Sequence, residues 1–258
     1  MAGPATTALL AGLVALAAAG WALRPVAPDS AIHHGAAPIA ATPDFTQAPV
    51  VLELFTSQGC SSCPPADALV EQLARTRGDM LVISRPVTYW DRLGWRDTLA
   101  KPENTDLQRA YAARGLAGYN GVYTPQAVID GRSGTVGSNA QDIAALFRQA
   151  MPDKRHAPQI ALAAAHKVTV VGAANLEAQL SLVALDSRET VSIALGENRD
   201  RTITYTNLLV GEAPLGTWRG GAATFDLPRD YRATAGADSF ALILRQGQAG
   251  PILAARRL

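Results

Sequence analysis

Cysteine and histidine are both scarce in this sequence, and each shortage limits the chemistry available to it. The 258 residues include two cysteines and four histidines. A structural zinc centre usually needs four ligands, mostly from these residue types, so we predict no metal site. Because Cys60 and Cys63 are the only cysteines, they are also the only pair that can form an intrachain disulfide.

An excess of charge of either sign is also absent. Lys and Arg number 23 and Asp and Glu 22, which gives a formal net charge of +1. The basic residues are scattered and form no long run, so we predict no nucleic-acid partner. Apolar residues make up 48% of the chain, enough to build one large domain or two small ones.

The N-terminal segment lacks charged side chains. Ala8 to Leu23 is uncharged and apolar. It is short for a membrane span of roughly 20 residues and long for a signal-peptide core of about 7–15. We predict that 1–23 is a cleaved signal peptide or an uncleaved anchor, with a buried apolar helix as the alternative. Residues 24–48 are predicted to be a Pro/Ala-rich linker. Either targeting interpretation predicts a periplasmic or secreted body, free or anchored to the cytoplasmic membrane.

Cys60 and Cys63 stand between a predicted buried strand at 50–55 and a predicted helix at 66–75. A helix N-terminus has unpaired amides and a partial positive charge, which favour a thiolate. The spacing therefore predicts a catalytic thiol–disulfide pair that needs no cofactor. Cys60, expected to be the more exposed, would attack a substrate disulfide, and Cys63 would resolve the mixed disulfide. Zinc binding and a static disulfide are the alternatives.

A second feature is the Thr124–Pro125 step before a predicted strand at 127–129. A proline at a strand edge in a tight turn is a candidate for a cis bond, and an ordinary trans bond is the alternative. In thioredoxin-like folds a cis-proline loop lies against the CxxC disulfide, and the backbone before it pairs with substrate. We therefore predict that Thr124 and Pro125 bind substrate. Tyr89 and Trp90 are predicted either to wall the same groove or to pack in the core.

Two carboxylates are predicted to tune the thiols. Glu53 lies on the strand that leads into the motif, where a buried carboxylate can accept a proton. Its alternative is a solvent-facing edge position. Asp67 lies four residues after Cys63 and so on the same helical face. Its alternative is a role confined to complementing the helix dipole.

The order of elements predicts two folded parts. In 49–152, strands alternate with helices, which predicts a thioredoxin-like α/β domain with a parallel arrangement of strands and an added hairpin at the edge. In 157–258, short alternating strands predict a mostly antiparallel, sandwich-like β domain without a catalytic constellation. Pro152 and Pro158 mark the predicted boundary.

Several stretches resemble one bacterial family, domain of unknown function 1223 (DUF1223), whose members are described as secreted or periplasmic and thioredoxin-like. The resemblance implies that fold and location but no substrate. One difference is Arg85-Pro86-Val87-Thr88, where the resemblance leads us to expect a histidine and an aspartate. The stretches that carry the resemblance are Glu53 to Asp67, Tyr89-Trp90-Asp91, Gly94-Trp95, Val122 to Gln126, Gly196-Glu197-Asn198 and Thr202 to Asn207.

These observations predict an extracytoplasmic thiol–disulfide oxidoreductase. Its partners would be the thiols and disulfides of exported proteins, together with a redox partner of its own. A non-catalytic binding or scaffold protein on a thioredoxin-like frame, and a metal carrier that uses the CxxC motif, are the alternatives, since a fold alone does not decide function.

Overall fold

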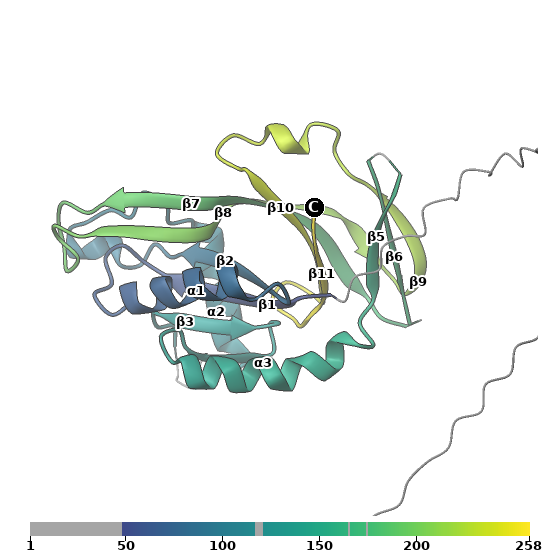
Figure 1. Cartoon of the computed structure of the whole chain (residues 1–258), viewed down its shortest axis with the longest axis horizontal. Helices are drawn as coiled ribbons and strands as arrows, with labels where there is room; N and C mark the ends of the chain where they lie inside the picture. The colour runs from purple at the N-terminus through teal and green to yellow at the C-terminus, as the bar shows by residue number, and fades with distance from the viewer. Residues whose placement is uncertain (1–47, 117–120, 165, 174) are drawn as a thin grey trace, which may run out of the picture. The chain divides into compact units, whose positions relative to one another are not determined.

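The computed structural model describes residues 48–116, 121–164, 166–173 and 175–258 (Figure 1). The predicted signal or anchor at 1–23 and nearly all of the 24–48 linker lie outside these residues. The described chain has a mixed α/β architecture built on a large, mostly antiparallel sheet. Its strands are β1 (Val50–Thr56), β2 (Met80–Pro86), β3 (Gln126–Ile129), β4 (Ser133–Val136), β5 (Gln159–Ala164), β6 (Lys167–Gly172), β7 (Ala178–Ser192), β8 (Thr202–Trp218), β9 (Gly221–Asp226), β10 (Ser239–Arg245) and β11 (Ile252–Arg257). The helices are α1 (Pro64–Thr76), η1 (Asp91–Leu93), α2 (Pro102–Ala113), α3 (Ala140–Lys154) and η2 (Tyr231–Ala233).

The eight-stranded sheet has the order β11-β10-β7-β8-β2-β1-β3-β4. Strand β1 runs parallel to β2 and antiparallel to β3, and β3 and β4 form an antiparallel hairpin at the edge. Within residues 49–152, the predicted parallel arrangement is limited to β1 and β2, and the predicted edge hairpin is present. The parallel pair is joined through α1, as parallel neighbours require a crossover connection.

The predicted division into 49–152 and 157–258 does not correspond to two separate sheets. Strand β8 pairs with β2 at Leu208 and Ser84, and this junction continues the N-terminal strands into β7, β10 and β11. The Asn207 amide donates to the Val82 carbonyl at 3.0 Å, which reinforces the junction. The described residues from 48 onward form one compact unit.

Pro152, at the predicted boundary, lies in the last turn of α3. This turn is held by a buried ion pair in which the Lys154 ammonium lies 2.9 Å from the Asp130 carboxylate just after β3. This tertiary contact stabilises the end of the helix, which continues beyond Pro152 to Lys154. Pro158 immediately precedes β5.

Helices cover both faces of the N-terminal strands. Helices α1 and α3 pack on the face that carries Leu52 and Leu54 of β1. Helix α2 packs on the opposite face against Phe55, through Tyr111. All seven residues of β1 are buried because both faces are covered, as is typical of a central strand in such a layer. Glu53 therefore lies on the α2 face, away from α1.

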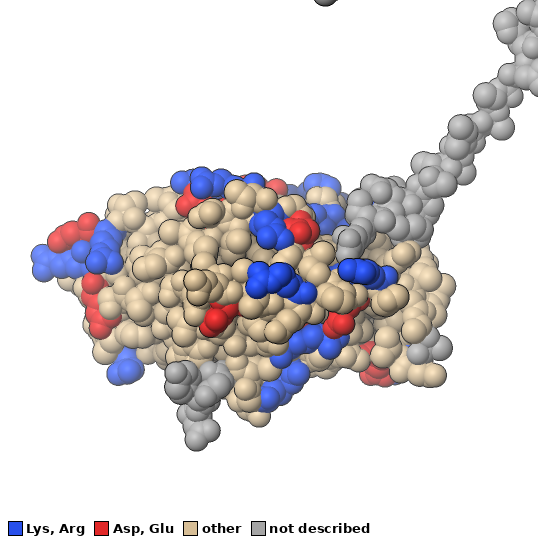
Figure 2. All heavy atoms as spheres, turned by 60° about the horizontal axis from the view of Figure 1, so that its bottom comes forward, with Lys and Arg blue, Asp and Glu red and all other residues tan. Residues whose placement is uncertain are grey.

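The second half builds a sandwich-like core, as predicted, but one of its two sheets is the shared eight-stranded one. The three-stranded sheet β5-β6-β9 packs on β7 and β10 through Val168, Val170, Leu180, Leu242 and the fully buried Trp218. The β7–β8 hairpin is much longer than predicted and extends over α1 (Figure 1). Acidic and basic side chains are interspersed on the face shown in Figure 2, which agrees with the near-zero net charge.

Candidate functional site

The two cysteines lie at the end of β1 and the start of α1, and they form a disulfide with the Cα atoms 5.4 Å apart. Both residues are fully buried, with 0% relative exposure. The prediction that Cys60 is the more exposed cysteine is therefore wrong. Gly59 belongs to the same loop, and a Cβ placed there would lie 3.1 Å from the Trp90 Cβ, so the loop and Trp90 are in close contact.

The helix N-terminus is poorer in donors than the sequence pattern suggests. Pro64 and Pro65 are the first residues of α1 and have no N–H. The Cys63 amide donates to the Cys60 carbonyl at 3.1 Å. The Ser62 hydroxyl lies 3.3 Å from the Cys60 sulfur, so it is a direct polar neighbour of that atom.

The Thr124–Pro125 peptide is cis, as the strand-edge proline suggested. It lies against the CxxC loop, because the Ser62 hydroxyl donates to the Thr124 carbonyl at 3.4 Å. The Trp90 indole N–H donates to the Thr124 hydroxyl at 2.8 Å. Tyr89 and Trp90 are half-buried neighbours whose ring centroids lie 6.5 Å apart. Disulfide loop, aromatic loop and cis-proline loop thus meet at one place.

Two acids are buried beside the disulfide loop. Burial raises the pKa of Asp67 to about 8, despite a hydrogen bond from the Thr56 hydroxyl to its Oδ1 at 2.8 Å, and the nearby Asp97 adds to the rise. The second oxygen, Oδ2, is buried and has no hydrogen-bond partner in the described part of the chain. Burial likewise raises the pKa of Asp97, although its carboxylate accepts the Gln58 amide at 2.8 Å. Asp67 is therefore a buried acid whose pKa lies well above that of an ordinary carboxyl group.

Glu53 does not belong to this group. Its carboxylate accepts hydrogen bonds from Arg85 at 2.7 Å, Arg245 at 2.8 Å and the Tyr111 hydroxyl at 2.5 Å. Burial alone would raise the pKa of Glu53, but the guanidinium groups of Arg245 and Arg85 outweigh it and hold the pKa at about 2. A carboxylate with so low a pKa is a weak base at neutral pH, so these ion pairs speak against the predicted role as a proton acceptor. Its predicted alternative, a solvent-facing edge position, is wrong.

The tip of the β7–β8 hairpin covers the disulfide loop. The buried Asn198 amide donates to the carbonyl oxygens of Gln58 at 2.9 Å and Cys60 at 2.8 Å. The neighbouring Glu197 carboxylate accepts the Ser61 amide at 3.1 Å. Trp95 also links the two parts: its indole N–H donates to the Gln58 side chain at 2.8 Å, and its ring packs with Ile193. The burial of both sulfurs is therefore accompanied by contacts from a segment more than a hundred residues away along the chain.

A comparison of the sequence with known protein families gives one match. The profile of the family "Protein of unknown function (DUF1223)" matches residues 51–245, which include the cysteine loop, the cis-proline loop and the hairpin tip. The chain belongs to this DUF1223 family. No curated protein sequence matches it.

Two solved structures resemble this DUF1223 protein. A structural-genomics target from Agrobacterium tumefaciens is 30% identical, and the similarity covers 83% of this chain and 95% of the other, with a TM-score of 0.69. HBP35 of Porphyromonas gingivalis is 11% identical over 82% of this chain and 75% of the other, with a TM-score of 0.49. The second similarity is too weak to add to the assignment.

Several residues of the site were not predicted from the sequence. Asn198 and Glu197 stand in a stretch that contributes to the DUF1223 resemblance, but nothing local links them to the cysteines. Asp97 follows an aromatic loop and carries no motif. Arg85, the difference from the expected pattern, is an ion-pair partner of Glu53, with an exposed fraction of only 2%.

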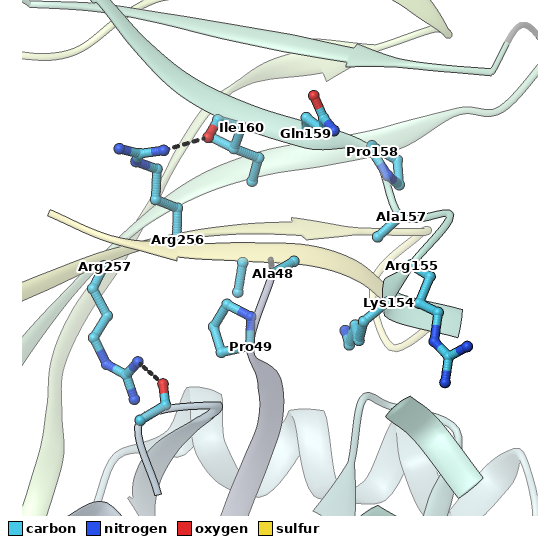
Figure 3. A pocket seen from close by; sticks show the side chains of 12 residues that line it. Ala48, Pro49, Lys154, Arg155, Ala157, Pro158, Gln159, Ile160, Arg256 and Arg257 are labelled. Carbon is cyan, nitrogen blue, oxygen red and sulfur yellow. Dashed lines mark hydrogen bonds between the residues drawn. The ribbon is translucent and has the colours of Figure 1, made fainter. Parts of the chain in front are cut away.

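One cavity in the described part of this DUF1223 chain is not lined by either cysteine. It has a volume of about 460 Å³ and opens where the chain enters β1 at Pro49 (Figure 3). The Arg256 and Arg257 guanidinium groups on its wall donate to the carbonyls of Ile160 and Gly78, at 3.0 and 2.9 Å. Among the described residues no cluster of three His, Cys, Asp or Glu is placed to hold a metal ion, and no helix is long and apolar enough to cross a membrane.

Replacing Asn198 with alanine should loosen the hairpin tip. The carbonyls of Gln58 and Cys60 would lose buried partners, so we expect the free energy of unfolding to fall by about 1–3 kcal/mol. A small phosphine should also reduce the disulfide faster, because the loop is less covered. Denaturant unfolding and the phosphine reduction rate check both effects. Arg199→Ala, a change at an exposed neighbour on the same tip, is the control, and equal behaviour of the two variants would contradict the role of Asn198.

Proposed function

We propose that this protein is an extracytoplasmic thiol–disulfide oxidoreductase built on a thioredoxin-like frame. The observation that carries the proposal is the Cys60–Cys63 disulfide lying between the start of α1 and the cis Thr124–Pro125 peptide. The strand order β2-β1-β3-β4, with β3 antiparallel to β1 and helices on both faces, supports the thioredoxin-like frame. The uncharged segment Ala8 to Leu23 supports a periplasmic or secreted location, free or anchored.

The reaction is a two-electron exchange between dithiol and disulfide. In the reducing direction the Cys60 thiolate attacks one sulfur of a substrate disulfide, forming a mixed disulfide and releasing a substrate thiolate. The Cys63 thiolate then attacks the Cys60 sulfur, forms the observed disulfide and releases the second substrate thiolate. Two electrons pass from the cysteine pair to the substrate, and a redox partner must return them. Thr124 and Trp90 border the place where the substrate backbone would lie.

Asp67 is the group we assign to the proton of Cys63. The two residues are four apart on α1, joined by the Asp67 amide donating to the Cys63 carbonyl at 3.1 Å, so their side chains share a helical face. A pKa of about 8 for Asp67 is close to that of an ordinary thiol, about 8.5, which suits proton exchange between the two. Its buried, unpartnered Oδ2 is free to accept the proton.

Asp67→Asn should lower the rate of the resolving step by about 10²-fold, because the amide cannot accept a proton. The oxidised protein should become more stable in the same variant. The raised pKa of Asp67 means that its contribution is fully present below about 3.8 and is lost as the pH rises through about 8. Wild type should therefore lose stability over this window, on the order of a few kcal/mol, while Asp67→Asn should not.

Insulin turnover and denaturant unfolding across pH measure the two effects of Asp67→Asn. Glu71→Gln, which changes a more exposed carboxylate of the same helix, is the matched control. Unchanged turnover would mean that Asp67 has no role in the mechanism. An unchanged pH dependence of stability would mean that the pKa of Asp67 is not raised in the folded protein.

The function itself is tested by reduction of insulin with the full-length protein and dithiothreitol, comparing wild type with Cys60→Ser. We expect wild type to accelerate insulin precipitation and Cys60→Ser to match the rate without protein. Equal acceleration by both proteins would overturn the proposal. Measuring the redox potential against glutathione would then show which direction of exchange is favoured.

A static disulfide in a non-catalytic binding protein is the second candidate, and the burial of both sulfurs favours it. A ring closed by two cysteines three residues apart constrains little of the unfolded chain, which speaks against a purely stabilising role. The reduction rate separates the two candidates. A disulfide that resists dithiothreitol in the folded protein supports the static role, and one that is reduced readily supports exchange.

A further inference from the structure

The contact between Glu197 and the cysteine loop brings a negative charge to the place where a thiolate would form. The Glu197 carboxylate accepts the amide of Ser61, the residue that directly follows Cys60. Hydrogen bonds from the Ser61 hydroxyl and amide lower the pKa of Glu197, so this carboxylate is ionised at neutral pH. It reaches the loop from the β7–β8 turn, between Ser192 and Thr202, and not from the loop itself.

Few other donors are available to stabilise a thiolate there. Pro64 and Pro65 remove two amides from the first turn of α1, and the Cys63 amide is already used by the Cys60 carbonyl. The Ser62 hydroxyl, 3.3 Å from the Cys60 sulfur, is the close polar neighbour that remains. Because the Ser61 amide is bonded to Glu197, it is not available to a Cys60 thiolate.

Other ionisable groups around the loop do not reverse this effect. Asp67 and Asp97 are buried acids whose pKa values are raised by burial, and Asp91 bonds the Asp97 amide. Arg201, on the same turn, donates to the Asn198 side chain at 3.2 Å. Glu197 therefore adds an ionised carboxylate in hydrogen-bond contact with the cysteine loop.

We propose that Glu197 is a tuning residue which disfavours the Cys60 thiolate and so makes the reduced pair a stronger electron donor. A carboxylate bonded to the residue after Cys60, although exposed to solvent, disfavours a thiolate there. A less stabilised reduced form shifts the dithiol–disulfide equilibrium toward the disulfide. The substrate class is then protein disulfides that need reduction, with electrons passing from the Cys60–Cys63 dithiol to the substrate. This inference rests on the proposed function and assigns the direction of electron transfer, from the protein to its substrate.

The test measures the acidity of the Cys60 thiol in full-length protein carrying Cys63→Ser, so that one thiol titrates. Thiolate ultraviolet absorbance is followed against pH, a readout that does not depend on access to the sulfur. Glu197→Gln keeps an oxygen acceptor for the Ser61 amide and removes the charge. We expect the Cys60 pKa to fall by about half a unit to one unit, or about three- to tenfold in thiolate fraction at neutral pH.

Salt and a matched variant separate charge from contact. The shift should shrink at about 1 M salt, where the Debye length is about 3 Å. Asp200→Asn removes a charge of the same sign from the exposed tip and should shift the pKa less. An unchanged pKa in Glu197→Gln, an equal shift in Asp200→Asn, or a shift in Glu197→Ala alone would each overturn the proposal.

With both cysteines present, the glutathione equilibrium of Glu197→Gln should move toward the dithiol by a similar factor, and an unmoved equilibrium would also overturn the assignment. Insulin reduction by the same proteins keeps the two proposals distinct. A shift of the Cys60 pKa in Glu197→Gln without insulin reduction by wild type would contradict the oxidoreductase function and support the electrostatic role of Glu197. Insulin reduction with an unshifted pKa would sink only the role of Glu197.

Discussion

Cys63→Ser should accumulate a stable mixed disulfide between Cys60 and insulin, whereas Cys60→Ser should accumulate none. In the first variant the attacking thiol remains and the resolving thiol is gone, so exchange stops after its first step. In the second the first step cannot occur. Turnover should fall in both to the rate without protein, the largest effect on activity that we expect from any single change.

Non-reducing gels and mass spectrometry of the trapped species measure this result. The mass should equal that of the protein plus one insulin chain, attached at Cys60. The control is the double variant, which should trap nothing. A mixed disulfide in Cys60→Ser but not in Cys63→Ser would reverse the assigned roles, and no mixed disulfide in either would favour the static disulfide.

Such trapping requires the disulfide loop to become accessible, because both cysteines are fully buried in the oxidised protein. The contacts of Asn198 and Glu197 with the loop are the ones that a substrate would have to displace or pass. Asn198→Ala combined with Cys63→Ser should therefore trap insulin faster than Cys63→Ser alone. The tip of the β7–β8 hairpin therefore affects both the access of substrate to the cysteine loop and the reactivity of the thiols.

The parts of the site that could be predicted from sequence are those specified by local signals. A buried strand, a CxxC motif, two prolines and a helix follow one another within a single stretch, and each is readable from residue type and spacing. The Thr124–Pro125 step is also local, since only an X–Pro bond is cis with any frequency. Its position against Ser62 followed from the fold that the CxxC motif suggested.

The contacts that the sequence did not reveal join residues far apart along the chain. Glu53 meets Arg245 across a sequence separation of 192, and Asn198 meets Cys60 across 138. Neither pairing has a local signal, because strand pairing alone brings the elements together. The same holds for the β2–β8 junction, which made one sheet where the turn and proline pattern suggested two. Tertiary context also turned Glu53 from a candidate base into an ion-pair partner.

Glu53→Gln should be the most destabilising of the single changes considered. It leaves the buried guanidinium groups of Arg85 and Arg245 without their shared carboxylate, and breaking a buried ion pair in this way typically costs about 3–5 kcal/mol. Glu212, 2.8 Å from Arg85, compensates only one of the two. Asp226→Asn, which breaks an exposed pair with Lys167, should change the free energy of unfolding by no more than about 1 kcal/mol.

Acid should reproduce the effect of Glu53→Gln in the wild-type protein. The pKa of Glu53 is lowered from 4.5 to about 2 in the folded state, chiefly because Arg245 and Arg85 outweigh the cost of burial. Its contribution to stability is therefore fully present above about 4.5 and is lost as the pH falls through about 2. Denaturant unfolding over this window should show wild type approaching Glu53→Gln in stability. A difference that stays constant down to the lowest pH would mean that the carboxylate is not what holds the two arginines.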